Sequence, residues 1–336
     1  MSLPEIKYCP STLQPRFTTY SPVAQLALFG SRTRKVSHIL PIGPPGKNAE
    51  LTREFNEKRK TISISGVQEK YSLLLEKNDL KLTASKGSHI LKPVPAERLE
   101  RIEEMPANEH VTMQIARQVF KIKTAACGMI FFDDGSPAYI TRRFDYKPDG
   151  TKYQIEDFAT LLGRSPEREG DDFKYNASYA DIASLIKKYV PAATVELINF
   201  FRIVLFNYLF ANGDAHLKNF ALMESEQGDY LLAPAYDLLC TALHIDDANL
   251  ALHHGLYEGD MDELSYLKHG TYTGQSFMVF AGKMGVQAAI AEKIIDESMK
   301  AVLPAMDMID RSFLSKEAKE KYKDIIGDRF RRFQMK

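Results

Sequence analysis

One strongly apolar stretch, VELINFFRIVLF at residues 195–206, is followed a few positions later by the polar stretch NGDAHLKNF at residues 212–220. The apolar stretch predicts a helix that is buried on nearly all sides. Asp214, His216 and Lys218 then lie near the end of a buried helix, where desolvating a polar group without a partner costs several kcal/mol. These side chains must therefore satisfy one another in a local hydrogen-bond network or bind a ligand.

The composition limits the classes of protein to which this chain can belong. With 336 residues, of which 44% are hydrophobic and 26% charged, the chain is long enough for one large domain or two packed lobes. Lys and Arg together number 44, as do Asp and Glu, which argues against a general binder of nucleic acids or membrane surfaces. We therefore expect no direct nucleic-acid binding and no membrane partner.

The cysteines and the N-terminus indicate the compartment. Cys9, Cys127 and Cys240 are far apart and show no CxxC spacing, so we expect reduced structural thiols. The N-terminus, MSLPEIKYCPSTLQPRF, lacks the apolar core of a signal peptide. Residues 195–211 are too short and too polar to span a membrane. These features predict a cytoplasmic protein.

Apolar periodicity changes along the chain from a strand pattern to a helix pattern. Residues 1–60 show little periodicity and predict a partly irregular N-terminal extension. From Thr61 onward apolar and polar residues alternate, which predicts strands. Pro106 and Asn108 then mark the start of a helix, with Asn108 as its N-cap.

The second half of the chain is predicted to be mostly helical. A hairpin is expected in GMIFFDDGSPAYITRRFD, and helices dominate beyond about residue 155. This order indicates an α+β fold of two lobes, with a β-rich N-lobe over 61–146 and a helical C-lobe over 147–336. The joint between them is expected near Arg143 to Tyr146.

The spacing within the polar stretch matches one element of a kinase active site. Asp214 and Asn219 are separated by four residues, as in the kinase catalytic loop, where the Asp accepts the substrate proton and the Asn holds a magnesium ion. Asp237 follows two further apolar segments, where a kinase places its metal-binding Asp. Carboxylate and amide oxygens suit Mg²⁺, with phosphates completing its shell.

Residues of the β-rich half fit the same plan. Lys92 is expected on a strand and Glu109 at the start of the next helix, as in the kinase ion pair that steadies a phosphate-binding lysine. The segment SISGVQEK at residues 63–70 stands where a phosphate-covering loop belongs. It has one glycine and therefore does not match the GxGxxG pattern.

Six short motifs, in order, resemble the HipA family of toxin serine/threonine kinases: SISGVQEK, HILKP, NEH, RRFD, NGDAHLKNF and APAYDLL. The resemblance covers roughly residues 60 to 300 and implies a two-lobe protein-kinase-like fold that uses ATP and Mg²⁺. It also implies Asp214 as the catalytic base and Asn219 and Asp237 as metal ligands. Glu109 matches by position only, and its supporting role beside Lys92 is inferred from kinases in general. The implied nucleotide-binding residues are Ser65, Gly66, Val67, Gln68, Glu69, Lys70, Lys92, Arg142, Arg143, Phe144, His216, Lys218, Asn219, Tyr236 and Asp237.

Two features make the compact HipT type the nearest match within that family. The chain begins its phosphate loop near residue 62 and so lacks most of an N-terminal β-subdomain, which the resemblance implies is supplied by a small HipS-like protein. The loop also carries two serines, Ser63 and Ser65, as expected autophosphorylation sites. A phosphoserine there would repel the nucleotide phosphates and switch the enzyme off. The resemblance further implies a helix-turn-helix antitoxin and a translation component, such as an aminoacyl-tRNA synthetase, as substrate.

Other interpretations of the same residues remain open from the sequence. Asn212 and Gly213 can form a helix C-cap, with Asp214 bonded to nearby amides. The residues also fit a kinase-fold phosphotransferase for a small molecule, or a nucleotide-binding pseudokinase. The segment DYKPDGTKYQIE at 145–156 approaches a calcium-loop pattern, but Lys147 occupies a ligand position, so we expect a hairpin turn instead.

Overall fold

The structure is a computed structural model that describes residues 3–45, 69–96, 99–147 and 149–335. The chain divides into two compact units. Unit 1 comprises Met1–Gln114, Ala125–Phe144 and Asp307–Lys319, and unit 2 comprises Ile115–Thr124, Asp145–Met306 and Glu320–Lys336. The chain thus passes from unit 1 to unit 2 at Phe144 and Asp145, among other positions. The division into an extension, an N-lobe and a C-lobe stays a prediction.

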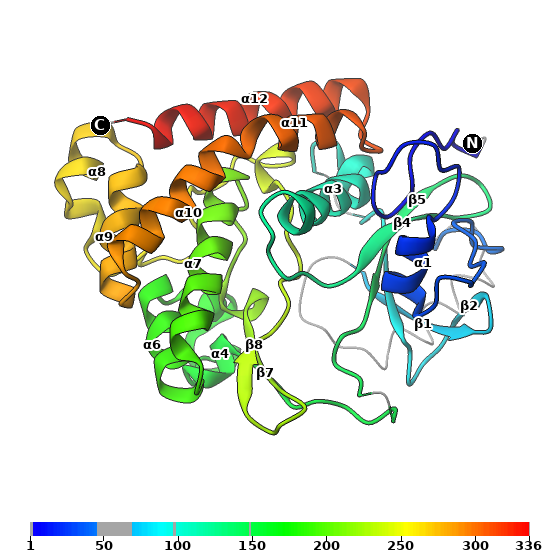
Figure 1. The fold of residues 1–336 in the computed structure, drawn as a ribbon, viewed down its shortest axis with the longest axis horizontal. Helices are drawn as coiled ribbons and strands as arrows, with labels where there is room; N and C mark the ends of the chain where they lie inside the picture. Colours follow the sequence, from blue (N-terminus) through cyan, green and yellow to red (C-terminus); the bar gives the residue numbers. More distant parts are fainter. Residues whose placement is uncertain (1–2, 46–68, 97–98, 148, 336) are drawn as a thin grey trace. The chain divides into compact units, whose positions relative to one another are not determined.

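Unit 1 is built on an antiparallel sheet of five strands in the order β2-β1-β3-β5-β4 (Figure 1). The predicted HILKP strand and the predicted hairpin are both confirmed, as β3 and as the pair β4–β5. The strands are β1 (Tyr71–Glu76), β2 (Asp79–Leu82), β3 (His89–Pro93), β4 (Cys127–Phe131) and β5 (Pro137–Arg142).

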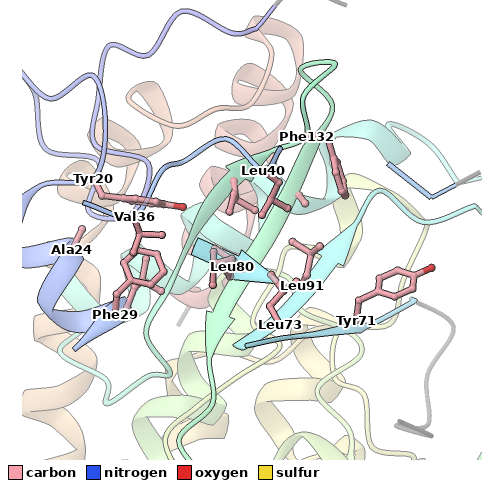
Figure 2. Packing of buried hydrophobic residues seen from close by; sticks show 14 of the residues in the cluster. Tyr20, Ala24, Phe29, Val36, Leu40, Tyr71, Leu73, Leu80, Leu91 and Phe132 are labelled. Atoms are coloured by element: carbon pink, nitrogen blue, oxygen red, sulfur yellow. The ribbon is translucent and has the colours of Figure 1, made fainter. Parts of the chain in front are cut away.

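The N-terminal segment contributes a helix and part of the core of unit 1. Helix α1 (Pro22–Phe29) is capped by Ser21, whose side chain accepts from Ala24 N, and it ends at Gly30 with φ 82°. Figure 2 shows side chains of this segment packed with those of the sheet. An eight-residue helix has too few turns to show periodicity, so the sequence predicts little structure where α1 lies. The buried cluster comprises Cys9, Tyr20, Ala24, Leu28, Phe29, Val36, Leu40, Tyr71, Leu73, Leu80, Leu91, Ile130, Phe132, Ala138 and Ile140.

Helix α3 (Met105–Gln118) begins four residues earlier than the sequence predicts, directly after the 3₁₀ turn η1 (Ile102–Glu104). Asn108 is therefore inside the helix and fully buried, and the prediction that it is the N-cap is wrong. Its carbonyl accepts from Thr112 Oγ1 at 2.8 Å. Pro106 falls in the first turn, where no amide donor is needed, so it does not delay the helix.

Unit 2 is mostly helical, as predicted, and includes a three-stranded antiparallel sheet in the order β6-β7-β8. Helices α6 and α7 lie side by side in Figure 1. Three of the described helices, α3, α11 and α12, have residues in both units. The elements are β6 (Ile155–Asp157), α4 (Phe158–Leu161), α5 (Pro166–Glu169), η2 (Asp171–Tyr175), α6 (Tyr179–Tyr189), α7 (Ala193–Leu209), η3 (Leu217–Asn219), β7 (Ala221–Glu224), β8 (Tyr230–Leu232), η4 (Thr241–Leu243), η5 (Asp260–Asp262), α8 (Leu264–His269), α9 (Gly274–Met284), α10 (Ala288–Lys300), α11 (Val302–Asp310) and α12 (Lys316–Phe333).

Helix α7 is the buried helix that the apolar stretch predicts. Ten of its side chains, from Leu197 to Leu209, are buried. Near its C-terminus Phe206 stacks on Phe210 with ring centroids 4.3 Å apart. Ala211 then takes φ 50°, a left-handed conformation that ends the helix. The chain reversal therefore occurs at Ala211, and the alternative of an Asn212–Gly213 cap is wrong.

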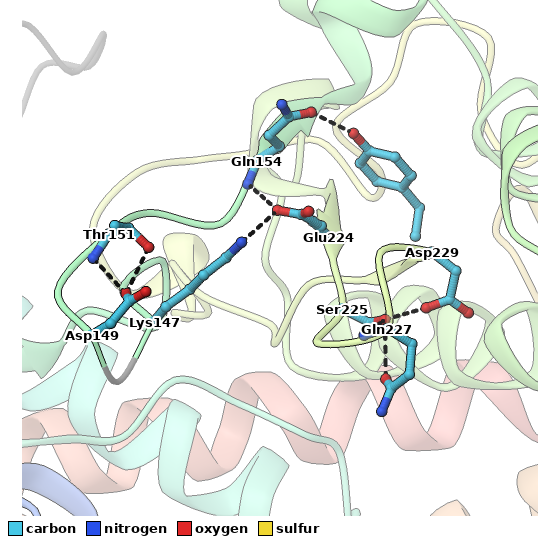
Figure 3. A network of polar contacts seen from close by, with 9 residues as sticks. Lys147, Asp149, Thr151, Gln154, Glu224, Ser225, Gln227 and Asp229 are labelled. Carbon is cyan, nitrogen blue, oxygen red and sulfur yellow. Dashed lines mark hydrogen bonds and ion pairs between the residues drawn. The ribbon is translucent and has the colours of Figure 1, made fainter.

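The segment that approaches a calcium-loop pattern is a turn held by its own polar contacts (Figure 3). Asp149 Oδ1 accepts from the backbone N and the Oγ1 of Thr151, at 2.9 and 2.6 Å. Lys147 Nζ lies 3.2 Å from Glu224 Oε2, and Tyr146 forms an isolated antiparallel bridge with Lys152. Within the described residues no cluster of three His, Cys, Asp or Glu side chains could hold a metal ion. The expected hairpin turn is confirmed.

Among the described helices, none is both long and apolar enough to cross a membrane.

Two buried histidines of unit 1 predict that its stability depends on pH. Burial lowers the pKa of His89 and of His110 to about 4, from an ordinary 6.5. Because the unfolded chain binds these protons near pH 6.5 and the folded chain does not, stability falls as the pH drops from about 6.5 towards 4. Each histidine contributes a slope of up to about 1.4 kcal/mol per pH unit in that window. Chemical denaturation at pH 7.5, 6.5 and 5.5 measures the slope.

His110→Gln should make this slope smaller, because glutamine can keep a polar contact with the Ser11 carbonyl and does not titrate. His254→Gln, at an exposed position, is the matched control for the substitution itself. Equal slopes for His110→Gln and the wild type would contradict the prediction.

Candidate active site

In unit 1, strand β3 and helix α3 bring together a lysine and a glutamate. Lys92 Nζ lies 2.5 Å from Glu109 Oε1, and their side chains are only 4% and 2% exposed. The ammonium also lies over the ring of Tyr139 on β5, 5.3 Å from its centroid. Burying two charges costs several kcal/mol per ion unless each is closely paired. The short distance between Lys92 and Glu109 is therefore what allows both charges to be buried. The predicted pairing of Lys92 with Glu109 is present.

In unit 2, the loop after α7 is held on several sides. Gly213 N donates to Thr241 Oγ1 at 2.8 Å, and the same hydroxyl donates to the Ala211 carbonyl at 3.1 Å. A Cβ on Gly213 would lie 2.5 Å from the Asp247 side chain and 2.7 Å from the Ala248 carbonyl. Glycine is therefore required here by close packing, and the loop has little room to move.

Amide side chains connect this loop to helix α7 by further hydrogen bonds. Asn212 Nδ2 donates to Asn207 Oδ1 at 2.9 Å, and Asn212 Oδ1 accepts from Asp214 N at 3.4 Å. The Tyr179 hydroxyl donates to the Ala215 carbonyl at 2.9 Å. The polar stretch is thus a hydrogen-bonded loop, yet the Asp214 side chain remains 46% exposed. An exposed carboxylate on a rigid loop is suited to meet a substrate hydroxyl.

Asp214 interacts with two aromatic residues. The Tyr175 hydroxyl donates to Asp214 Oδ1 at 2.6 Å. His216 Nε2 lies 4.0 Å from the same oxygen. Burial, followed by the Lys174 ammonium, lowers the pKa of His216 to about 3. His216 is therefore neutral near pH 7 and serves as an uncharged neighbour of Asp214.

Asn219 and Asp237 line the same pocket of unit 2, together with Asn207, Asn212 and Tyr236. Asn219 Oδ1 accepts from His216 N at 3.1 Å, which occupies one of the two lone pairs of that oxygen. Asp237 has φ 55°, a left-handed conformation that is uncommon for residues other than glycine but is adopted more readily by aspartate than by most. One amide oxygen and one carboxylate fit Mg²⁺, which is held by few protein ligands when phosphates complete its shell.

Lys218 and Tyr236 lie in the same part of unit 2. The Tyr236 hydroxyl donates to the Lys218 carbonyl at 2.9 Å, which ties the segment after β8 to η3. Lys218 Nζ lies 5.8 Å from the centroid of the Phe173 ring. The structure thus groups Asp214, His216, Lys218, Asn219, Tyr236 and Asp237 within one unit.

The predicted hinge residues lie at the end of β5 and just after it. Arg142 N donates to the Ala126 carbonyl at 2.8 Å, and Arg143 N donates to the Ser88 carbonyl at 2.9 Å. These two amides are therefore engaged within the sheet of unit 1. Any adenine contact by either amide would require breaking one of these bonds. The assignment of Arg142, Arg143 and Phe144 to adenine stays a prediction.

Most of the predicted phosphate loop lies outside the described residues, including Ser63, Ser65, Gly66, Val67 and Gln68. Glu69 and Lys70 are described, immediately before β1. Glu69 Oε2 accepts from the Tyr71 hydroxyl at 2.6 Å. The roles assigned to this loop, including autophosphorylation, stay predictions.

Three residues to which the sequence patterns assign no role in catalysis or binding contact the candidate catalytic loop or brace it from within. Thr241 and Asn212 brace its backbone, and Tyr175 contacts the Asp214 carboxylate. Asn212 lies inside the polar stretch and could have been chosen on that ground. Tyr175 and Thr241 are far from it in sequence, and no short motif marks them.

Comparison with models of known protein families identifies the family to which the chain belongs. The model of the HipA-like C-terminal domain family matches residues 62–306, which is most of the chain. The chain belongs to this family. The match includes both the Lys92–Glu109 pair and the loop from Asp214 to Asn219, so the HipA-like resemblance drawn from six short motifs is confirmed.

Curated relatives of this HipA-like chain bear kinase names. A protein of Haemophilus influenzae named "Putative kinase" is 26% identical over 283 residues, covering 80% of this chain and 81% of the relative. "Putative kinase Y4dM" of Sinorhizobium fredii is 32% identical over 207 residues, covering 56% of this chain and 47% of that longer relative. The HipA-like chain therefore has kinase-named relatives of similar and of greater length.

Two solved structures show the fold. HipA of Shewanella oneidensis, solved in a complex with HipB and operator DNA, matches with a TM-score of 0.64 at 20% identity, covering 88% of this chain and 73% of that chain. The proinflammatory kinase CtkA of Helicobacter pylori matches with a TM-score of 0.52 at 15% identity, covering 81% of this chain and 91% of that chain. The predicted kinase-like α+β fold of this HipA-like chain is confirmed.

Proposed function

We propose that this HipA-like chain is a Mg²⁺- and ATP-dependent protein serine/threonine kinase. The observation that carries the proposal is the buried pair of Lys92 and Glu109, at 2.5 Å and 4% and 2% exposure. A fold that needed only stability would do as well with apolar side chains at these positions. A lysine held in place by a glutamate is the arrangement with which kinases position the phosphates of ATP.

The residues of unit 2 supply the remaining parts of the reaction. Asp214 accepts the proton of the attacking hydroxyl, because its carboxylate is exposed on a braced loop. Asn219 and Asp237 would hold Mg²⁺, which when bound would supply charge neutralisation for the transferred phosphate. His216 is neutral at pH 7 and so places no positive charge beside Asp214. A positive charge there would make the carboxylate a weaker base. The protein then contributes positioning and charge neutralisation, while the phosphoryl group passes directly from ATP to the attacking hydroxyl and ADP leaves.

Family membership supports a role as the toxin of a toxin–antitoxin pair, with a component of translation, such as an aminoacyl-tRNA synthetase, as substrate. The HipA neighbour was solved with HipB and operator DNA, which supports a helix-turn-helix antitoxin as partner. By the resemblance of its motifs to the compact HipT type, we also propose a small HipS-like protein as partner. Autophosphorylation at Ser63 or Ser65 would switch the enzyme off.

The test is phosphosite mapping of the wild type and Asp237→Asn after incubation with ATP, with Mg²⁺ or with EDTA. With ATP and Mg²⁺ we expect phosphate on Ser63 or Ser65 of the wild type, and with ATP and EDTA we expect none. Asp237→Asn should be slower by about 100-fold or more, because a catalytic metal is worth several kcal/mol. Asp246→Asn, at an exposed position of the same unit, should behave as the wild type.

Two outcomes would contradict the proposal. ATP binding without any phosphate transfer would favour a nucleotide-binding pseudokinase. Transfer to an aminoglycoside or a sugar, with none to protein, would favour a small-molecule phosphotransferase.

A further inference from the structure

Tyr175, at the end of η2, forms a short hydrogen bond with the candidate catalytic base. Its hydroxyl lies 2.6 Å from Asp214 Oδ1. This distance is typical of a hydroxyl that donates to an ionised carboxylate. Such a hydrogen bond is roughly twice as strong as one between neutral groups. Burial, followed by the Asp214 carboxylate, raises the pKa of the Tyr175 hydroxyl. The hydroxyl therefore keeps its proton and remains a donor.

The Tyr175 ring is held in one place by its surroundings. It packs edge-on against His216, with centroids 5.3 Å apart, and stacks on His253 at 5.8 Å. The ammonium of Lys174 lies 5.0 Å from the ring centroid. The Tyr175 carbonyl accepts from the backbone N of His253 at 2.9 Å and of Ala177 at 3.0 Å. Contacts at the ring and at the backbone make Tyr175 a fixed support for Asp214.

The bond leaves Asp214 able to act on a substrate. An ionised carboxylate offers about four acceptor positions on two oxygens, so one bond from Tyr175 does not fill it. The side chain is 46% exposed although Tyr175 covers part of it. The loop fixes the backbone of Asp214 through Asn212 Oδ1, but that contact does not set the rotation of the carboxylate. The hydrogen bond from the Tyr175 hydroxyl acts on the carboxylate itself.

We propose that Tyr175 is a positioning residue for phosphoryl transfer, which orients the Asp214 carboxylate towards the attacking hydroxyl. The inference rests on the proposed kinase function and adds a residue that none of the sequence motifs contains. Tyr175 touches neither substrate nor phosphate in this role and acts through Asp214. A misdirected base reduces the rate of the chemical step without weakening nucleotide binding.

The experiment measures self-phosphorylation of the full chain by intact mass at a series of Mg-ATP concentrations. Tyr175→Phe removes the hydroxyl and keeps the ring contacts. We expect the rate at saturating ATP to fall roughly 10- to 100-fold, as for loss of a hydrogen bond to a charged group. The ATP concentration for half-maximal rate should stay within about twofold, because ATP binding does not depend on the base. Tyr189→Phe, at an exposed position on α6, is the matched control and should match the wild type.

A double-variant cycle with Asp214→Ala separates positioning from a structural role. If Tyr175 acts through Asp214, Tyr175→Phe should change the residual rate of Asp214→Ala by less than about twofold. Equal losses in both backgrounds, or a higher ATP requirement, would show a structural role and overturn the inference.

An unchanged rate would also overturn the inference, as would a faster one, because the tyrosine would then block the base. In these cases the wild type still transfers phosphate and the proposed function stands. A wild type that binds Mg-ATP and transfers no phosphate would instead remove the proposed function and this inference together.

Discussion

Glu109→Ala is expected to lower the free energy of unfolding by about 3–5 kcal/mol, because it leaves the Lys92 ammonium buried without its closest charged partner. The large effect follows from the 4% and 2% exposure of the two side chains, which prevents water from replacing the lost carboxylate. Denaturant titration measures the change. Phosphate transfer should be lost as well, because the lysine would no longer be held in position.

Two variants separate the structural from the functional effect of this pair. Lys92→Met combined with Glu109→Leu removes both charges and should regain most of the lost stability, since apolar replacements of buried pairs are often neutral or stabilising. This double variant should nevertheless transfer no phosphate. Lys81→Met breaks an exposed pair with Glu76 on the same sheet, at 2.6 Å, and should not change the denaturation midpoint measurably. A double variant that remains active would disprove a phosphate-binding role for Lys92.

Asp214→Asn is expected to slow phosphate transfer by about 10²–10⁴-fold, the usual contribution of a general base. Asparagine has nearly the same shape and can still accept from Tyr175, but it cannot take up a proton. The side chain is 46% exposed, so the fold should be unaffected and Mg-ATP should still bind. The initial rate of phosphate incorporation and a binding isotherm for Mg-ATP test the two statements. A rate within about tenfold of the wild type would show that another group acts as the base.

Much of the fold is visible in the sequence because it depends on local pattern. The apolar stretch before Asp214 predicts α7, and alternation predicts β3 and the β4–β5 hairpin. The four-residue spacing of Asp214 and Asn219 predicts a loop that can present both side chains, and the loop is present. Local signals suffice for these features because neighbours in sequence are also neighbours in space.

The features that sequence does not show depend on distant contacts or on short elements. The contact of Tyr175 with Asp214 joins residues 39 positions apart, and it follows from the packing of η2 against the loop. The early start of α3 depends on η1, which precedes it, and on a proline that fits the first turn. The need for glycine at position 213 follows from Asp247 and Ala248, far along the chain. Periodicity carries no information about such pairs.

Unit 1 is completed by residues 307–319, which come late in the chain. There Phe313 packs against His110 and Phe131, Arg311 Nη1 donates to the Leu13 carbonyl at 3.2 Å, and Ser315 N donates to the Glu104 carboxylate at 3.1 Å. During synthesis on the ribosome, the strand that carries Lys92 and the helix that carries Glu109 emerge more than half a chain before these contacts can form. The contacts that residues 307–319 make with unit 1 can therefore form only after both of these elements have left the ribosome.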